Sequence, residues 1–182
     1  MNKYLIIITI IFTTLLLFSQ APVFAQTRER AEIPIEYKWK LEDLYPSDQA
    51  WNQSKEKLAA QFDDVEKYKG KLASSASELL DCLEFDSRLS KEFGRLYSYA
   101  HMKSDEDTRN SKYLAMEQEM QQLGTDYSSL AAFITPEITK MDKETIDKFI
   151  EQEPGLKIYK MSLYDILRMK AHTLSEKEEK IL

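Results

Sequence analysis

The chain has 182 residues, of which 43% are hydrophobic and 31% charged, and its formal net charge is −6. An acidic balance without a basic stripe along the sequence argues against nucleic acid as a partner. Because Cys82 is the only cysteine, the chain cannot form an internal disulfide, and packing has to supply its stability.

The first 25 residues have the three parts of a secretory signal peptide. Lys3 supplies the positive end, an apolar run covers residues 4–18, and Val23 and Ala25 precede a cleavage site. The alternative is a membrane anchor, but the run contains three threonines and is shorter than the roughly 20 apolar residues of a spanning helix. We expect residues 1–25 to be a signal peptide cleaved after Ala25. The mature protein is then exported, to a periplasm or to the medium, without a stable membrane anchor.

Residues 26–46 are expected to form an extended lead-in, and residues 47–182 a helical lobe. Ser47 can cap a first helix that runs to about Lys69 and ends at Gly70. The apolar residues that share one face of this helix are Trp51, Leu58, Phe62 and Val65.

Ser75 and Glu78 form a capping box at the start of a second, long helix. Apolar residues then recur near helical spacing up to the acidic residues 105–107: Leu79, Leu83, Leu89, Phe93, Leu96 and Ala100. A kink near Asp86 or Gly94 is possible in a helix of this length.

The next segment has the most regular apolar period of the chain. Its residues step by three and four positions: Tyr113, Met116, Met120, Leu123, Tyr127, Leu130 and Ile134. Such a seam requires another helix packed against it, and Pro136 is expected to end this one.

Asp142 is expected to start a shorter helix, and Pro154-Gly155 to break the chain again. A further helix face then carries Leu156, Tyr159, Leu163, Ile166 and Leu167. A last capping box, Ser175 and Glu178, has only four residues after it, so we expect the chain to be the front part of a longer protein, truncated at its C-terminal end.

Alternation with period two never persists long enough to predict a sheet. The predicted fold class is therefore all-α, an antiparallel helical bundle with short loops.

Residues that could carry chemistry are few. His101 and His172 lie 71 positions apart, without the i, i+4 pair that a helical zinc site uses, so both are interpreted as structural. Cys82 lies among acidic residues that oppose thiolate formation, and a small buried apolar residue is favoured over a reactive thiol.

The acidic residues Asp105, Glu106 and Asp107 could hold a hard cation, but they lack the spacing of a calcium loop and are interpreted as charge at a helix start. The aromatic and methionine residues from Tyr113 to Tyr127 are interpreted as core rather than as a binding surface. The sequence thus predicts no catalytic, cofactor-binding or metal-binding residue in this chain.

Five segments, taken together, resemble the opening of oligoendopeptidase F and its relatives among the thimet-oligopeptidase-like zinc peptidases. They are Trp39 to Asp48 (WKLEDLYPSD) followed by Trp51, Tyr68 to Leu72 (YKGKL), Gly94 to Ala100 (GRLYSYA), Asp105 to Thr108 (DEDT) and His172 to Glu176 (HTLSE). They occur in the order found in the amino-terminal lobe of that family, over residues 35–182. Two features depart from the family: the signal peptide, because many relatives are cytoplasmic, and Ala171, where a proline is expected.

This resemblance implies a mostly helical enzyme in which the lobe walls a channel that admits short peptides. Zinc would be held by a His-Glu-x-x-His helix and a further glutamate, both far downstream of Leu182 in the missing C-terminal catalytic domain. No residue here matches that motif, so the resemblance assigns no metal ligand to this chain, which is expected to be inactive alone.

The sequence leaves two functions open. One is the amino-terminal part of an exported zinc metalloendopeptidase that hydrolyses short peptides. The other is a free-standing helical module of the cell envelope that binds peptides or a protein without catalysis.

Overall fold

The computed structural model describes residues 32–170, and the predicted signal peptide and the last capping box lie outside them. The chain divides into two compact units, residues 1–38 and 39–182. Within the described part of the first unit, the 3₁₀ helix η2 (Ile35–Tyr37) leaves Ile35 and Tyr37 exposed to solvent.

The second unit is built from helices, in agreement with the predicted all-α class, and residues 39–170 contain no strand. It begins with the 3₁₀ helix η3 (Leu41–Asp43), where an extended lead-in was expected as far as residue 46. Leu41 and Tyr45 are buried in the same hydrophobic core as the helices.

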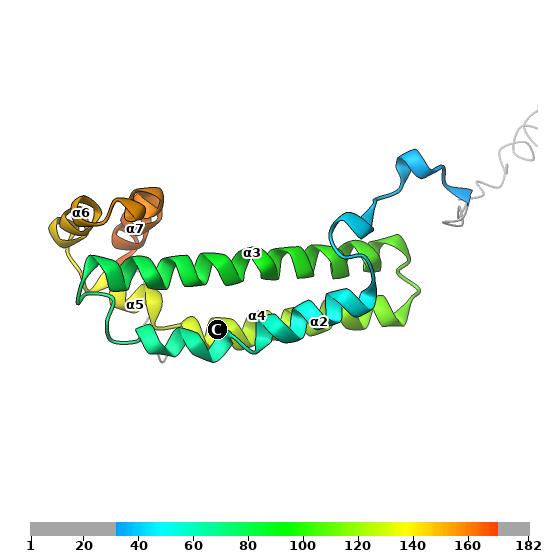
Figure 1. Cartoon of the computed structure of the whole chain (residues 1–182), viewed down its shortest axis with the longest axis horizontal. Coiled ribbons are helices and arrows are strands. Elements are labelled where there is room, and N and C mark those ends of the chain that lie inside the picture. The colour runs from blue at the N-terminus through cyan, green and yellow to red at the C-terminus, as the bar shows by residue number, and fades with distance from the viewer. Residues whose placement is uncertain (1–31, 171–182) are drawn as a thin grey trace, which may run out of the picture. The chain divides into compact units, whose positions relative to one another are not determined.

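Three long elements form the body of this unit, and Figure 1 shows them lying side by side. They are α2 (Asp48–Ala59), α3 (Ala76–Glu106) and α4 (Ser111–Ala131). Figure 1 shows α3 running opposite to both α2 and α4, and α3 is one continuous helix past Asp86 and Gly94. The helix that the seam from Tyr113 onward requires is therefore α3.

The predicted caps at the starts of these helices are confirmed. Ser47 Oγ accepts a hydrogen bond from the Ala50 amide at 3.1 Å, and Ser75 Oγ accepts one from the Glu78 amide at 3.2 Å. Each bond satisfies an amide that lacks a partner inside the helix.

The prediction of one helix from Ser47 to Lys69 is wrong in its second half. α2 ends at Ala59, and a 3₁₀ helix, η4 (Phe62–Tyr68), follows. Phe62, Val65 and Tyr68 are all buried and lie three positions apart. Because side chains at i and i+3 eclipse in a 3₁₀ helix, this winding places all three on the core side.

The loop after η4 is fixed to a distant helix. Gly70 has a φ of +78°, which favours glycine, and it ends η4 as expected. The Glu137 carboxylate accepts hydrogen bonds from the Gly70 amide at 2.5 Å and from the Leu72 amide at 3.4 Å. Backbone amides that would otherwise lack a partner are thus satisfied by α5.

The prediction that Pro136 ends the third helix is also wrong. α4 already ends at Ala131, and Pro136 lies in the first turn of a separate short helix, α5 (Ile134–Thr139). Proline is tolerated there because the amides of a first turn have no partner within the helix.

The last elements pack together beside the beginning of α3 (Figure 1). They are α6 (Lys143–Gln152), the 3₁₀ helix η5 (Pro154–Tyr159) and α7 (Lys160–Arg168). Asp142 caps α6 as predicted, accepting the Thr145 amide at 2.7 Å. Leu156 and Leu163 are buried, whereas Tyr159, Ile166 and Leu167 pack at the edge of the core.

Candidate functional site

A groove of about 660 Å³ opens in the described part of the chain, and we call it the α2–α3 groove. One wall is the end of α2, the floor and second wall are the residues of α3 from Glu84 to Arg95, and η5 closes it with Ile158 and Tyr159. Its volume lies in the range of ligand-binding clefts.

Packing beneath the groove explains why these elements meet. Leu58 of α2 and Leu89 of α3 both line the groove and are buried, so the two helices meet beneath it. η5 comes close to α3 because Gly155 has no side chain: a Cβ there would lie 2.7 Å from Leu80 Cδ2. Gly155, which the sequence marked only as a chain break, thus sets how closely η5 approaches α3.

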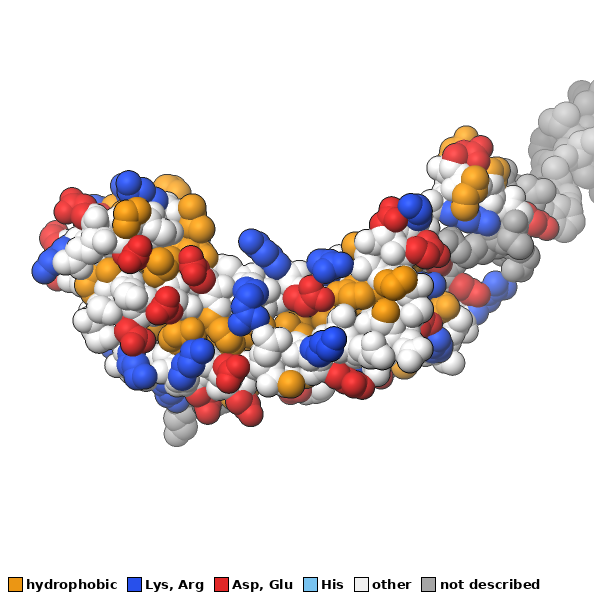
Figure 2. All heavy atoms as spheres, in the orientation of Figure 1, with side chains coloured by type: hydrophobic (Ala, Val, Ile, Leu, Met, Phe, Trp, Pro, Cys, Tyr) orange, Lys and Arg blue, Asp and Glu red, His pale blue; other side chains and the backbone are white. Residues whose placement is uncertain are grey.

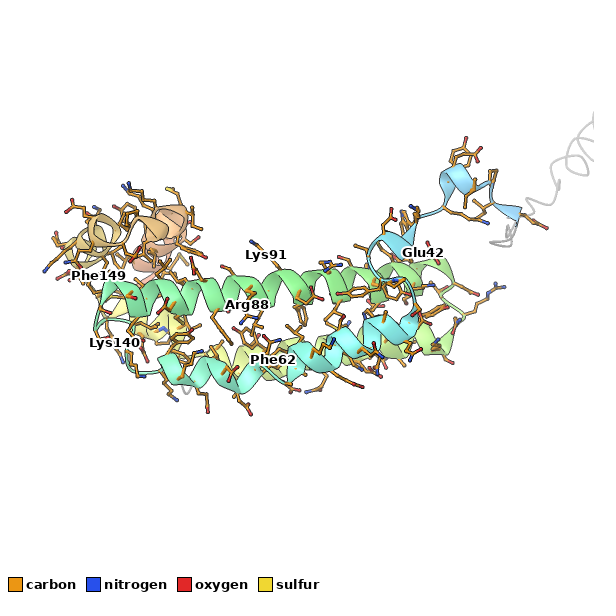
Figure 3. All side chains as sticks on the ribbon, in the orientation of Figure 1. Glu42, Phe62, Arg88, Lys91, Lys140 and Phe149 are labelled. Carbon is orange, nitrogen blue, oxygen red and sulfur yellow. The ribbon has the colours of Figure 1, made fainter. Side chains whose placement is uncertain are left out.

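The lining of the groove is rich in positive charge. It contains four cations, Lys57, Arg88, Lys91 and Arg95, and two carboxylates, Glu84 and Glu92. Figure 2 shows Lys and Arg side chains gathered over the middle of α3, beside the hydrophobic surface of the α6–α7 region. In Figure 3, Lys91 points away from α3 into the open space, while Arg88 lies on the side that faces α2.

One cation and one carboxylate of the lining neutralise each other. Arg95 Nη1 lies 3.2 Å from Glu92 Oε2, and Arg95 Nη2 donates to the Leu44 carbonyl at 3.0 Å. The Tyr45 hydroxyl donates to Glu92 Oε1 at 2.6 Å, and desolvation together with this carboxylate raises the pKa of Tyr45. Glu92 and Arg95 therefore tie α3 to the segment before α2.

A smaller crevice of about 180 Å³ opens between η4, α3 and α4. Its walls include the rings of Phe62, Phe93 and Tyr127. The Tyr127 hydroxyl donates to Asp86 Oδ1 at 2.8 Å. Desolvation raises the pKa of Asp86, so this carboxyl is a partly buried acid whose hydrogen bond comes from a neutral group.

His101 joins α3 to α4. Its Nδ1 lies 2.9 Å from Glu117 Oε1, its Nε2 lies 3.5 Å from Asp105 Oδ2, and its ring stacks on Tyr97. The hydrogen bond with Glu117 is the main cause of a raised His101 pKa. The two carboxylates contact opposite ring nitrogens, so this arrangement does not bring them together with His101 around one metal ion.

Cys82 is fully buried, as predicted, and desolvation raises the pKa of its thiol to about 12. Such a thiol stays protonated at neutral pH and is a poor nucleophile. Met116 and Met120 are likewise buried against α3, so the interpretation of the methionine and aromatic residues as core is confirmed.

The acidic residues 105–107 do not start a helix, and that interpretation is wrong. Asp105 and Glu106 form the last turn of α3, and Asp107 caps its C-terminal end. Asp107 instead pairs with Arg109, with Oδ1 2.9 Å from Nε. Within residues 32–170 no group of three or more His, Cys, Asp or Glu side chains could hold a metal ion.

The α2–α3 groove was not predicted from the sequence. The spacing of Arg88, Lys91 and Arg95 along one helix face was a visible signal, since these positions are three, four and seven residues apart. Lys57 is more than 30 positions away in the sequence, and only the packing of α2 on α3 brings it to the same groove.

Comparison with known proteins gives a consistent result. Residues 137–182 match the family model described as Oligopeptidase F. The chain is 39% identical over 157 residues to Oligopeptidase PepF of Bacillus subtilis (strain 168), which covers 86% of this chain and 23% of that protein. It is 34% identical over 156 residues to the plasmid Oligoendopeptidase F of Lactococcus lactis subsp. cremoris, covering 85% and 26%.

Solved structures agree with the sequence relatives. Oligoendopeptidase-F from Enterococcus faecium superposes with a TM-score of 0.69 and 32% identity, over 75% of this chain and 27% of that one. A putative peptidase from Chlamydophila abortus gives a TM-score of 0.66 at 25% identity, over 86% and 26%. The chain therefore spans about a quarter of the length of the relatives that it matches.

Proposed function

Because this chain belongs to the oligoendopeptidase F family, as its amino-terminal part, we propose that it serves an exported zinc metalloendopeptidase that hydrolyses short peptides. The observation that carries the proposal is the 39% identity over 86% of this chain to a protein named Oligopeptidase PepF. Export is proposed from Lys3, the apolar run and Ala25 at the amino terminus.

We assign zinc and the glutamate that activates its water to the three quarters of the relatives that this chain does not cover. The described residues do not fit a zinc site, since within residues 32–170 no group of three or more His, Cys, Asp or Glu side chains could hold a metal ion. The contribution of this chain is then shape and binding: its helices wall the channel that admits a peptide, and its polar groups orient the peptide backbone.

The α2–α3 groove is the part of this lobe best suited to contact a peptide. It is open, it is partly apolar, and it is lined by charged side chains. Such contacts hold the peptide in place, so less entropy is lost when the peptide reacts in the catalytic domain.

The test is to produce the complete reading frame and the 182-residue chain side by side and to assay both with internally quenched fluorescent peptides. We expect hydrolysis by the complete product, its loss on adding a chelator, and no hydrolysis by the 182-residue chain. Chelator-sensitive hydrolysis by this chain alone, or a complete product that binds peptides without cutting them, would contradict the proposal. The second outcome would favour the helical binding module instead.

Export is tested separately by sequencing the amino terminus of the product made in a secreting host. Cleavage after Ala25 leaves Gln26 as the first residue. A product that keeps Met1 and stays inside the cell contradicts this part of the proposal.

A further inference from the structure

We infer that the α2–α3 groove binds acidic oligopeptides, with Lys57, Arg88 and Lys91 contacting carboxylates and Ile158 contacting an adjoining apolar side chain. From the proposed function we take only that the ligand is a peptide. Its acidic character follows from the charges of the groove.

The groove holds more positive charge than its own carboxylates neutralise. Arg95 is paired with Glu92, and Arg88 Nη1 donates at 2.6 Å to Gln61 Oε1, which is a neutral acceptor. Within residues 32–170, the ammonium groups of Lys57 and Lys91 have no hydrogen-bond or ion-pair partner. Three cations thus face the groove without an acidic partner, although the whole chain is acidic. A local positive potential on a negative protein selects anionic ligands.

The arrangement of these cations suits an extended peptide. Arg88, Lys91 and Arg95 lie on one face of α3, and seven residues of helix rise about 10 Å. This length matches about three residues of extended chain. Lys57 stands on the opposite wall, so a peptide between α2 and α3 would have positive charge on both sides.

The groove also offers an apolar contact. Ile158 is 79% exposed, which is high for a large aliphatic side chain, and Tyr159 lies half-buried beside it. Burial of Ile158 against an apolar side chain of the ligand would remove this surface from water. The expected ligand therefore combines glutamate or aspartate with an aliphatic residue.

Glu84 opposes this preference. It lines the same groove, and no hydrogen bond or ion pair of its carboxylate is found in residues 32–170. A carboxylate there repels an acidic ligand, so its removal and the removal of the lysines have opposite expected effects.

The experiment measures fluorescence anisotropy of the labelled hexapeptide Glu-Leu-Glu-Glu-Leu-Glu with the full 182-residue chain. The comparison probe has glutamine in place of each glutamate. The main variant is Lys57→Gln with Lys91→Gln, and its matched control is Lys71→Gln with Lys140→Gln, which removes the same charge from two exposed lysines outside the groove. Circular dichroism establishes that every variant keeps its helical content.

We expect the parent chain to bind the acidic probe more tightly than the glutamine probe. The main variant should bind the acidic probe about fivefold more weakly than the parent chain does, because it lacks two exposed charge pairs. The control should bind like the parent chain, and Glu84→Gln should bind the acidic probe more tightly. Raising the ionic strength from about 0.05 M to about 0.5 M should weaken binding of the acidic probe only.

Equal binding of the two probes, or equal loss in the main variant and in its control, would overturn the inference. So would equally tight binding of heparin, because the groove would then attract any polyanion. Anisotropy needs no hydrolysis, so a complete product without peptidase activity would refute the proposed function and leave this result standing.

Discussion

At the scale of single residues, two hydrogen bonds between α2 and α3 pair polar groups in the core. Tyr99 donates to Asp48 at 2.8 Å, and Trp51 Nε1 donates to the Leu96 carbonyl at 2.9 Å. In the described part of the chain, no buried side-chain nitrogen or oxygen lacks a partner. Each pair joins two helices, so each polar contact also fixes how the helices are placed.

His101 gives the protein a pH dependence near neutrality. Its folded pKa is raised, chiefly by Glu117, so the folded state favours the protonated imidazole. This stabilisation is complete below about pH 6.5, the unfolded pKa, and is lost as the pH rises through the higher folded value. We expect the urea midpoint to fall between about pH 6 and about pH 8.

His101→Gln should remove this part of the pH dependence, because glutamine does not titrate. The parent chain is the control and should keep it. An unchanged slope in the His101 variant would show that other groups cause the effect. Since nearly half of the His101 side chain is exposed, the change should be small.

Asp86 and Tyr127 provide a second prediction for single residues. Tyr127→Phe removes the hydrogen bond to a partly desolvated carboxylate and should cost about 1–3 kcal/mol of unfolding free energy. Asp86→Asn keeps an acceptor for Tyr127 and removes the charge, so it should cost less or stabilise the protein at pH 7. Urea unfolding of both variants measures this order, and a larger loss in Asp86→Asn would contradict it.

At the scale of elements, local signals in the sequence fix where helices begin, and packing fixes how they continue. Ser47, Ser75 and Asp142 each accept an amide of the first turn of their helices. After Ala59, however, the core residues of η4 recur every three positions, and the winding changes from α to 3₁₀. The element boundary therefore depends on the surface that the segment meets.

Two glycines on neighbouring elements should respond oppositely to alanine. A Cβ at Gly94, inside α3, has nothing within 4 Å, so Gly94→Ala should stabilise the protein by about 0.5–1 kcal/mol. A Cβ at Gly155 would lie 2.7 Å from Leu80 Cδ2, so the Leu80 side chain has to shift and Gly155→Ala should destabilise the protein by about 1 kcal/mol.

Thermal or urea unfolding gives both values. The two variants differ only in position, so they are each other's control. Stabilisation by Gly155→Ala would mean that η5 can move away from α3 at little cost, and the α2–α3 groove would then lose its third wall.

At the scale of the whole molecule, the chain spans about a quarter of the length of the relatives that it matches, and its described residues form a helical lobe. No helix among residues 32–170 is long and apolar enough to cross a membrane. Charge is unevenly spread: the chain is acidic, yet the α2–α3 groove is lined by four cations. This contrast is the electrostatic feature on which peptide selection would depend.

Zinc should not stabilise the isolated 182-residue chain. A ligand that binds only the folded state raises the melting temperature, so zinc or a chelator should leave the melting temperature of the 182-residue chain unchanged. The complete reading frame is the control, and its melting temperature should fall on chelation. A rise with zinc in the 182-residue chain would show a metal site in it.

The sequence by itself determined the fold class, the family and the starts of the three helices capped by Ser47, Ser75 and Asp142. Capping side chains bind amides within three residues, and apolar residues spaced three and four apart indicate a buried helix face. Both signals are local, so they can be recognised from the sequence alone. For the same reason, Cys82 and the residues from Tyr113 to Tyr127 were placed in the core correctly.

Only the tertiary structure decided the change of winding after Ala59, the position of Pro136 inside α5, and the α2–α3 groove. The groove needs Lys57, Arg88 and Ile158, which come from three separate elements. Their meeting depends on the packing of Leu58 near Leu89 and on the close approach at Gly155. Contacts between residues so distant in sequence produce no periodic pattern of residue types, because they depend on how whole helix surfaces pack together.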